Sequence, residues 1–228
     1  MWYYIFMVNV KILTDCVRKS TAYLPIIFLL TGVIIIKALE EKILKDGKIL
    51  PGNVLKVGSF LNQQIDTEML SEIGREIARL YKDSGVTKIL TIEASGIAIA
   101  VSAAFCMNVP VVFAKKNKSS NVSGDVFFAE VESFTHKTVN NIVVAKEYIS
   151  PSDNVLIVDD FLAYGNALVG LMELVQKAGA GLSGCAIAIE KGFQKGGDAL
   201  REKGVRIESL AIIDKMTDDS IEFRPQDN

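Results

Sequence analysis

The stretch Val155-Leu-Ile-Val-Asp-Asp-Phe-Leu-Ala-Tyr-Gly-Asn-Ala167 decides the fold. Four apolar residues in a row are typical of a parallel strand that is buried on both faces of a sheet. Two carboxylates, Asp159 and Asp160, follow where we expect this strand to end, and a short glycine loop (residues 163–167) then leads into a helix that ends near Ala178. Ligands of open α/β sheets bind beyond the carboxyl ends of parallel strands, so this order predicts a binding site.

The two halves of this segment suit different parts of one ligand. Backbone N–H groups at the start of a helix bind phosphate without a basic side chain, and glycine lets the ligand approach closely. The carboxylates of Asp159 and Asp160 accept hydrogen bonds from ribose hydroxyls, and their charge favours a ribosyl cation. An acid pair after a strand is often only a helix cap. It is the combination with the strand and the glycine loop that indicates a phosphorylated ribose.

Strand and helix patterns alternate from Lys37 onward. Residues 115–139 contain Lys, Asn, Ser and Gly with a weak alternation, which predicts a long loop or a flexible hairpin, and such excursions are often lids. Because strand and helix patterns alternate along the whole of this part, we expect a single α/β domain. The spacing of apolar residues predicts helices over residues 37–45, 66–83 and 97–106, and strands over residues 88–92, 109–114, 182–189 and 207–213.

The composition argues against several classes of function. Charged residues make up 23% of the 228-residue chain and the formal net charge is -2, so there is no basic field to hold a nucleic acid. Cys16, Cys106 and Cys185 are far apart in apolar surroundings, which predicts reduced thiols in the cytoplasm. The single histidine, His136, cannot build a histidine metal cluster, and we expect no metal site made by the protein. No GxGxxG motif follows the first strand, which disfavours a dinucleotide-dependent oxidoreductase.

Residues 1–36 differ from the rest of the chain. Residues 20–36 carry no charge, but Pro25 and Gly32 interrupt the apolar run, which falls short of the roughly 20 residues that span a bilayer. Three interpretations stay open: a membrane anchor, an added hydrophobic helix, and translated sequence upstream of the true start. We favour the last, so the folded domain is predicted to span residues 37–228, with membrane contact only if the apolar run is an anchor.

The acid pair with its glycine loop resembles the motif that binds phosphoribosyl pyrophosphate (PRPP) in the type I phosphoribosyltransferase family. The resemblance extends from about Lys37 to Phe223. It implies the type I phosphoribosyltransferase fold, an α/β fold with a parallel sheet flanked by helices, a small hood from the N- and C-terminal segments, and a flexible lid loop. Tyr164 and Asn166 depart from the motif, which usually has asparagine and glutamine there. The other supporting blocks are residues 54–62, 91–96, 109–114 and 189–193.

Residue by residue, the resemblance implies four groups of contacts. The 5-phosphate of PRPP would be bound by Ala163, Tyr164, Gly165, Asn166 and Ala167, and the ribose by Asp159 and Asp160. The pyrophosphate would face Glu93, Ala94, Ser95 and Gly96, with Lys115, Lys116 and Lys118 at the start of the lid. The purine would be surrounded by Leu55, Asn62 and Lys191.

The implied function is that of a glycosyltransferase of purine salvage. It would transfer the 5-phosphoribosyl group from PRPP to N9 of xanthine and release pyrophosphate, with Mg²⁺ bound mainly through PRPP and two copies forming a homodimer. Guanine, hypoxanthine or adenine remain alternative bases, because the glycine loop does not contact the base. A protein that senses PRPP or purines without catalysis is a further alternative, although residues 1–36 lack a basic helix-turn-helix.

Overall fold

The computed structural model describes residues 24–116, 125–133 and 138–226. Its helices are α2 (Leu24–Asp46), α3 (Thr67–Leu80), α4 (Gly96–Met107), α5 (Asn166–Lys177) and α6 (Gly196–Glu202), with a π-helical turn at Gly58–Asn62 and 3₁₀ turns at Lys146–Tyr148 and Gly192–Gln194. Its strands are β1 (Lys48–Leu50), β2 (Val54–Lys56), β3 (Lys88–Ile92), β4 (Val111–Lys116), β5 (Val126–Ser133), β6 (Thr138–Ala145), β7 (Asn154–Leu162), β8 (Gly181–Lys191), β9 (Ile207–Met216) and β10 (Ile221–Phe223).

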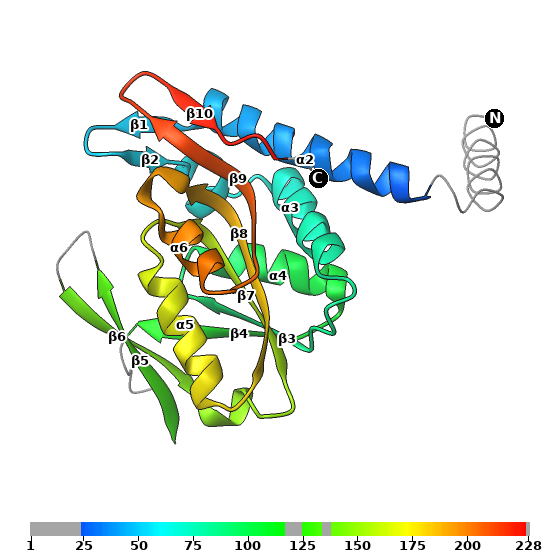
Figure 1. Cartoon of the computed structure of the whole chain (residues 1–228), viewed down its shortest axis with the longest axis vertical. Coiled ribbons are helices and arrows are strands. Elements are labelled where there is room, and N and C mark those ends of the chain that lie inside the picture. Colours follow the sequence, from blue (N-terminus) through cyan, green and yellow to red (C-terminus); the bar gives the residue numbers. More distant parts are fainter. Residues whose placement is uncertain (1–23, 117–124, 134–137, 227–228) are drawn as a thin grey trace.

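An eight-stranded sheet in the order β10-β9-β8-β7-β3-β4-β6-β5 forms the centre of the molecule (Figure 1). Strands β4, β3, β7, β8 and β9 are parallel, whereas β10 and the β5–β6 hairpin pair antiparallel at the two edges. The short β1–β2 hairpin forms a separate sheet at the same end of the molecule as β10. The mostly parallel sheet agrees with the predicted α/β fold.

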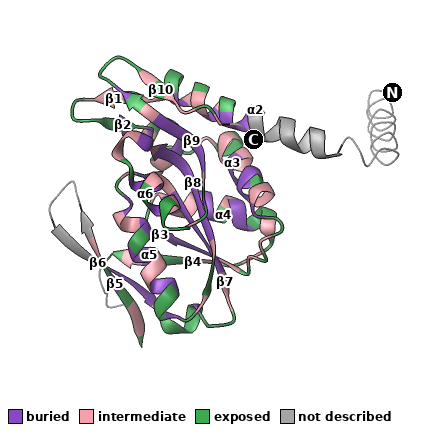
Figure 2. Ribbon diagram, in the orientation of Figure 1, coloured by how far each residue is buried: buried purple, intermediate pink, exposed green. Residues whose placement is uncertain are grey.

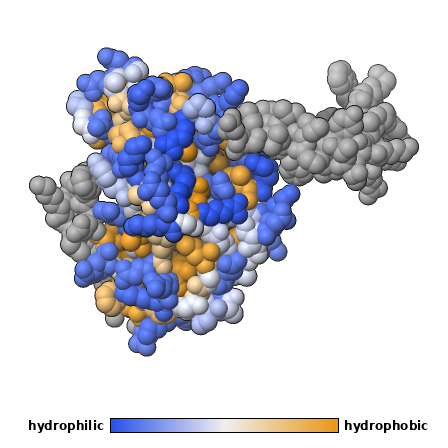
Figure 3. Space-filling view, viewed as in Figure 1, coloured by the Kyte–Doolittle hydropathy of each residue, from blue (hydrophilic) through white to orange (hydrophobic). Residues whose placement is uncertain are grey.

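Strand β7 is buried on both faces, as its apolar run predicts. Leu156 and Val158 pack into a core cluster with α2, α3 and α4, whereas Val155 and Ile157 pack into a second cluster with α5. Figure 2 shows the buried strands of the sheet between exposed helix faces. Polar side chains cover most of the face drawn in Figure 3. Helices therefore cover both faces of the sheet and leave its carboxyl edge for the loops.

Helix α2 crosses the predicted domain boundary at Lys37 without a break. Ile36, Leu39 and Ile43 on this helix are buried, so its second half belongs to the folded domain. The helix begins at Leu24, whereas residues 1–23 lie outside the described residues. Within the described ranges, no helix has both the length and the apolar character needed to cross a bilayer. The boundary itself stays a prediction.

Several predicted element ends were wrong. Strand β7 does not end before the acid pair but continues to Leu162, because residues through Leu162 keep pairing with β8. For residues 115–139 the hairpin alternative is confirmed by the antiparallel β5–β6 pair, although β6 continues to Ala145. Lys118 and His136 lie outside the described residues.

The cysteine prediction was right for one of the two cysteines that the structure describes. Cys185 is fully buried, and burial raises the pKa of its thiol to about 12. Cys106 on α4 is exposed, which differs from the apolar surroundings expected from the sequence. Both are free thiols, and Cys16 lies outside the described residues.

Candidate active site

Two adjoining cavities lie at the carboxyl ends of β3, β7 and β8. The first cavity, of about 430 Å³, is lined by the β1–β2 turn, the glycine loop, Lys191 and Gln194. The second cavity, of about 260 Å³, is lined by the β3–α4 turn (residues 93–96), Lys116 and the acid pair. Asp159 and Ala167 line both cavities, so the two form one continuous site around the acid pair.

The glycine loop lies at the start of α5. Gly165 precedes the first residue of this helix and has φ of +90°, a left-handed conformation that favours glycine. A side chain at this position would also come within 3.2 Å of Leu200 on α6. The first N–H groups of a helix have no carbonyl partners within it, and they carry the positive end of the helix dipole. The helix start at this end of the first cavity therefore has the backbone donors and the dipole that suit an anion.

The acid pair is buried to different extents. Asp159 is only 6% exposed, and its Oδ1 accepts a hydrogen bond of 2.9 Å from the backbone N–H of Asp160. Burial, and then the neighbouring charge of Asp160, raise the pKa of Asp159 well above its ordinary value. Asp160 is half-buried and accepts a hydrogen bond of 3.3 Å from Nδ2 of Asn62. One carboxyl thus favours the neutral form, and the other is held by an amide donor.

The β3–α4 turn lies directly against the acid pair. Its Glu93–Ala94 peptide bond is cis, and Glu93 Oε1 accepts a hydrogen bond of 2.7 Å from the backbone N–H of Lys116. A Cβ atom on Gly96 would lie 2.9 Å from Oδ1 of Asp159 and would overlap the hydroxyl of Thr91, so glycine is required there. The turn, the end of β4 at Lys116 and the acid pair therefore surround the second cavity.

Lys191 lies on the wall of the first cavity at the end of β8. Its Nζ donates a hydrogen bond of 3.0 Å to the backbone carbonyl of Asn53 and lies 5.7 Å from the centre of the Phe161 ring. Burial lowers the pKa of this lysine. An ammonium group has three donors, so Lys191 keeps donors for a ligand carbonyl in the cavity.

The structure brings most of the predicted site residues together. The glycine loop and Lys191 line the first cavity, and Glu93, Ala94, Ser95, Gly96 and the acid pair line the second. Two residues assigned to the purine lie elsewhere. Asn62 lines neither cavity and reaches Asp160 instead, and Leu55 is buried in the core while its neighbours Asn53 and Val54 line the cavity.

The sequence analysis missed Gln194 and Phe161. Both line the first cavity, and Oε1 of Gln194 is buried without a hydrogen-bond partner among the residues that the structure describes. Gln194 follows Lys191 by three residues and directly follows the block 189–193 that supports the resemblance. This position in the sequence is the signal that could have marked it as a site residue. An unpaired buried acceptor costs free energy unless a ligand or water supplies a donor.

The acidic side chains of the site do not by themselves form a metal centre. Over residues 24–116, 125–133 and 138–226, no three His, Cys, Asp or Glu side chains gather in an arrangement that would hold an ion. The half-buried carboxylate of Asp160 in the second cavity fits a hard cation such as Mg²⁺ only if a ligand supplies most of its oxygens.

Comparison with known proteins identifies close relatives. Residues 62–218 match the Phosphoribosyl transferase domain family. The chain is 55% identical over 188 residues to a protein of Lachnoclostridium phytofermentans named xanthine phosphoribosyltransferase, which covers 82% of this chain and 97% of the relative. A protein of the same name from Lactiplantibacillus plantarum is 50% identical over 191 residues, with 84% of this chain and 98% of the relative covered.

Solved structures show the same fold. The crystal structure of adenine phosphoribosyltransferase from Rhodothermus marinus superposes with a TM-score of 0.64 and covers 79% of this chain and 99% of that one. The sequence identity is 19%, so this similarity concerns the fold alone.

Proposed function

Because this chain belongs to the phosphoribosyltransferase family, we propose that it is an enzyme of purine salvage that joins PRPP and xanthine. It transfers the 5-phosphoribosyl group to N9 of xanthine, giving xanthosine 5′-monophosphate and pyrophosphate. One observation carries the proposal: the glycine loop and Lys191 line a single cavity, which adjoins the β3–α4 turn across the acid pair. Phosphate, ribose, pyrophosphate and base then each have matching groups.

At C1 of PRPP the reaction breaks one bond and forms one. The bond from C1 of PRPP to the pyrophosphate oxygen breaks, the bond from C1 to N9 forms, and the N9 proton passes to solvent. With the 5-phosphate on the glycine loop and the pyrophosphate against the β3–α4 turn, C1 lies beside Asp159 and Asp160. The glycine loop and the β3–α4 turn would hold PRPP at both ends, so that N9, C1 and the leaving oxygen are aligned. Such positioning supplies much of the rate enhancement in group transfers.

The acid pair suits the ribose and the charge that develops on it. The carboxylate of Asp160 accepts hydrogen bonds from ribose hydroxyls and stabilises positive charge at C1. Asp159, whose raised pKa favours the neutral form, donates as well as accepts. The proposed catalytic role of the pair is therefore electrostatic and positional, and it needs no covalent intermediate.

Mg²⁺ is proposed to arrive bound to PRPP. When bound, it offsets the charge of the departing pyrophosphate, and Asp160 is the residue that would complete its coordination. This assignment follows from the second cavity, where a half-buried carboxylate faces the space beside the β3–α4 turn.

Lys191 is proposed to select the base. Its ammonium group donates hydrogen bonds and accepts none, so it matches a purine carbonyl oxygen and repels an amino group. Xanthine carries oxygens at both C2 and C6, guanine only at C6, and adenine at neither. The flat ring of Phe161 below the lysine offers a surface for the base to lie against.

We further propose a cytoplasmic homodimer. On α4, Phe105 is 83% exposed and Val101 is 37% exposed beside a groove that Val109 and Pro110 also line. Large apolar side chains with this exposure are typical of interfaces between copies. Sedimentation of the full chain should give a dimer and Phe105→Ser should shift it toward the monomer, whereas a monomeric parent would exclude the dimer.

The proposed function is tested by assaying the purified full chain with PRPP, Mg²⁺ and each of xanthine, guanine, hypoxanthine and adenine. We expect xanthosine 5′-monophosphate and equimolar pyrophosphate from xanthine, with a kcat/KM above those for the other bases. A higher kcat/KM for guanine or adenine would assign another base, and no product from any base would favour a protein that senses its ligand without catalysis.

A further inference from the structure

Glu190, the residue before Lys191, is completely buried at the end of β8. Successive side chains of a strand point to opposite faces, so Glu190 turns away from the cavity that Lys191 lines. It lines neither cavity of the site. A carboxylate removed from water in this way is stable only when it is paired and hydrogen-bonded.

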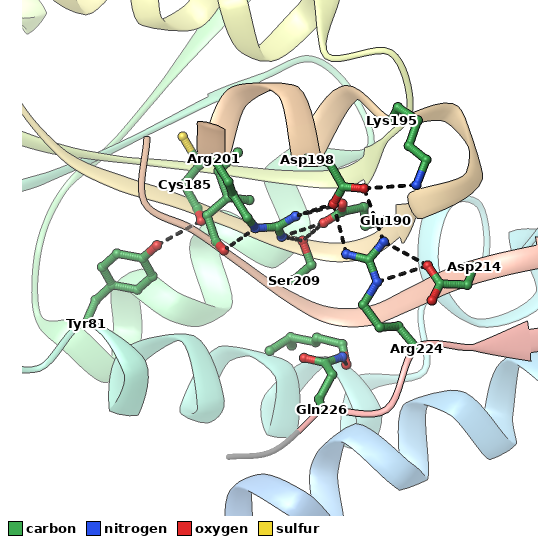
Figure 4. Close-up of polar contacts among 12 residues, drawn as sticks. Tyr81, Cys185, Glu190, Lys195, Asp198, Arg201, Ser209, Asp214, Arg224 and Gln226 are labelled. Carbon is green, nitrogen blue, oxygen red and sulfur yellow. Dashed lines mark hydrogen bonds and ion pairs between the residues drawn. The ribbon is translucent and has the colours of Figure 1, made fainter. Parts of the chain in front are cut away.

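Arg201 on α6 supplies that partner. Its Nη1 and Nη2 donate to the two carboxylate oxygens of Glu190 at 2.9 and 2.6 Å, a bidentate geometry that fixes the angle between the groups as well as their distance. The hydroxyl of Ser209 donates to the same carboxylate, and Nε of Arg201 donates to the carbonyl of Ile207. Figure 4 shows these contacts between β8, β9 and α6. Helix α6 is thereby tied to the end of β8.

The first residue of α6 lies against the glycine loop. The backbone N–H of Gly196 donates to the carbonyl of Ala163 at 3.2 Å, and a Cβ atom on Gly196 would overlap the backbone of this loop. A Cβ atom on Gly165 would lie 3.2 Å from Leu200 on α6. The loop that begins α5 therefore rests directly on α6, and the position of α6 sets the position of the loop.

A second ion-paired arginine extends the contacts to the C-terminal segment. Arg224 pairs with Asp198 on α6 at 2.9 Å and with Asp214 on β9 at 2.8 Å (Figure 4). A Cβ atom on Gly192, which follows Lys191, would lie 2.9 Å from Oδ1 of Asp214. The same cluster thus contacts the turn after Lys191 and the helix behind the glycine loop.

We propose that Glu190 and Arg201 are positioning residues that hold α6 against the glycine loop and so set the affinity for the 5-phosphate of PRPP without touching it. The inference rests on the proposed function, because it takes PRPP as the ligand of that loop. Two adjacent residues of β8 then serve the two halves of the site. Lys191 contacts the base, and Glu190 positions the loop that binds the phosphate.

The test compares two ion pairs of the same kind. Arg201→Met removes the partner of Glu190, and Arg201→Met combined with Glu190→Gln removes the pair without leaving a buried charge. The control is Arg79→Met on α3, where Glu76 is 1% exposed and accepts hydrogen bonds of 2.7 and 2.9 Å from Arg79, and where both residues lie outside the two cavities. Thermal melts identify the assay temperature at which each variant is folded.

We expect both Arg201 variants to raise the KM for PRPP on the order of tenfold or more, with the KM for xanthine within about twofold of the parent, because a displaced loop affects the phosphate first. Arg79→Met should lower the melting temperature and leave the KM for PRPP unchanged. An unchanged KM for PRPP in the folded double variant would overturn the inference, as would an equal rise in the control. Failure of the parent itself to bind PRPP would instead refute the proposed function.

Discussion

Nδ2 of Asn62 donates a hydrogen bond of 3.3 Å to Oδ2 of Asp160, across 98 residues of sequence. The contact joins the π-helical turn Gly58–Asn62 to the acid pair on β7. An amide donor on one oxygen fixes the rotation of the carboxylate and leaves its other oxygen for the ribose or the metal. We therefore predict that Asn62 acts through the acid pair, whereas the resemblance implies a contact with the purine.

Asn62→Ala should lower kcat/KM for PRPP by roughly tenfold, which corresponds to the ~1.5 kcal/mol of a hydrogen bond to a charged group. The KM for xanthine should change little, because Asn62 lines neither cavity. Steady-state kinetics with each substrate varied in turn separate the two effects. A rise in the KM for xanthine alone would return Asn62 to the purine pocket.

Lys191→Ala should weaken the use of xanthine by about 1.5–3 kcal/mol, or roughly 10- to 100-fold in kcat/KM, because a charge-assisted hydrogen bond to the base is lost. The affinity for PRPP should stay near that of the parent. Lys215→Ala is the matched control, since that lysine is 73% exposed and pairs with Glu222 at the surface. Equal KM values for xanthine in Lys191→Ala and the parent would show that the base binds elsewhere.

Local signals in the sequence account for most of the fold. The apolar run of β7 predicted a doubly buried strand, and Asp66 predicted a helix start that the structure confirms, since its side chain accepts a hydrogen bond of 3.1 Å from the N–H of Met69. Both depend on neighbouring residues alone, through burial on two faces and through capping.

Contacts between distant residues could not be predicted in this way. The apolar run that predicts β7 stops at Val158, but pairing with β8 carries the strand to Leu162. The partners of Asn62 and Glu190 depend on the packing of separate elements, and no local pattern marks them. The pieces of the site were therefore recognisable in the sequence, whereas their mutual contacts required the structure.

Gly165→Ala should raise the KM for PRPP on the order of tenfold and destabilise the protein by about 1 kcal/mol, because alanine is strained at a φ of +90°. Gly179→Ala is the control at the other end of α5, where φ is +70° and the nearest atoms belong to Pro151 at 3.5 Å. It should lose similar stability and keep the KM for PRPP. If both variants change that KM equally, the glycine loop has no special role in binding phosphate.

Gln194→Leu should raise the KM for xanthine roughly tenfold, about 1.4 kcal/mol, if the buried Oε1 accepts from a ring N–H of the base. The melting temperature should stay the same or rise, because leucine removes an acceptor that has no partner among the described residues. Gln226→Leu is the control, because Nε2 of Gln226 donates to the carbonyl of Leu210 at 3.1 Å outside the two cavities. It should lower the melting temperature and leave the KM for xanthine unchanged. An unaltered KM in Gln194→Leu would remove Gln194 from the base site.

Asp159→Asn should make the protein more stable than the parent at neutral pH while it lowers activity. The folded protein raises the pKa of Asp159 above the ordinary value near 3.8, so between these two values the folded state binds a proton that the unfolded state has released. The parent's stability therefore falls as pH rises through this window and then levels off. Urea unfolding at several pH values from acid to neutral should show the advantage of Asp159→Asn growing over the same window, to on the order of 1 kcal/mol.

Asp66→Asn serves as the control, because it should change the stability at neutral pH in the opposite direction. The ion pair with Lys42, at 2.9 Å, holds the pKa of Asp66 below its ordinary value, so its contribution is present above that value and is lost as pH falls through the lowered pKa. Asparagine keeps the helix cap and removes only the charge, so this variant should be less stable than the parent at neutral pH and equal to it in acid. If Asp159→Asn followed the same direction as Asp66→Asn, Asp159 would be an ionised, stabilising carboxylate, and its role as a neutral donor to the ribose would be wrong.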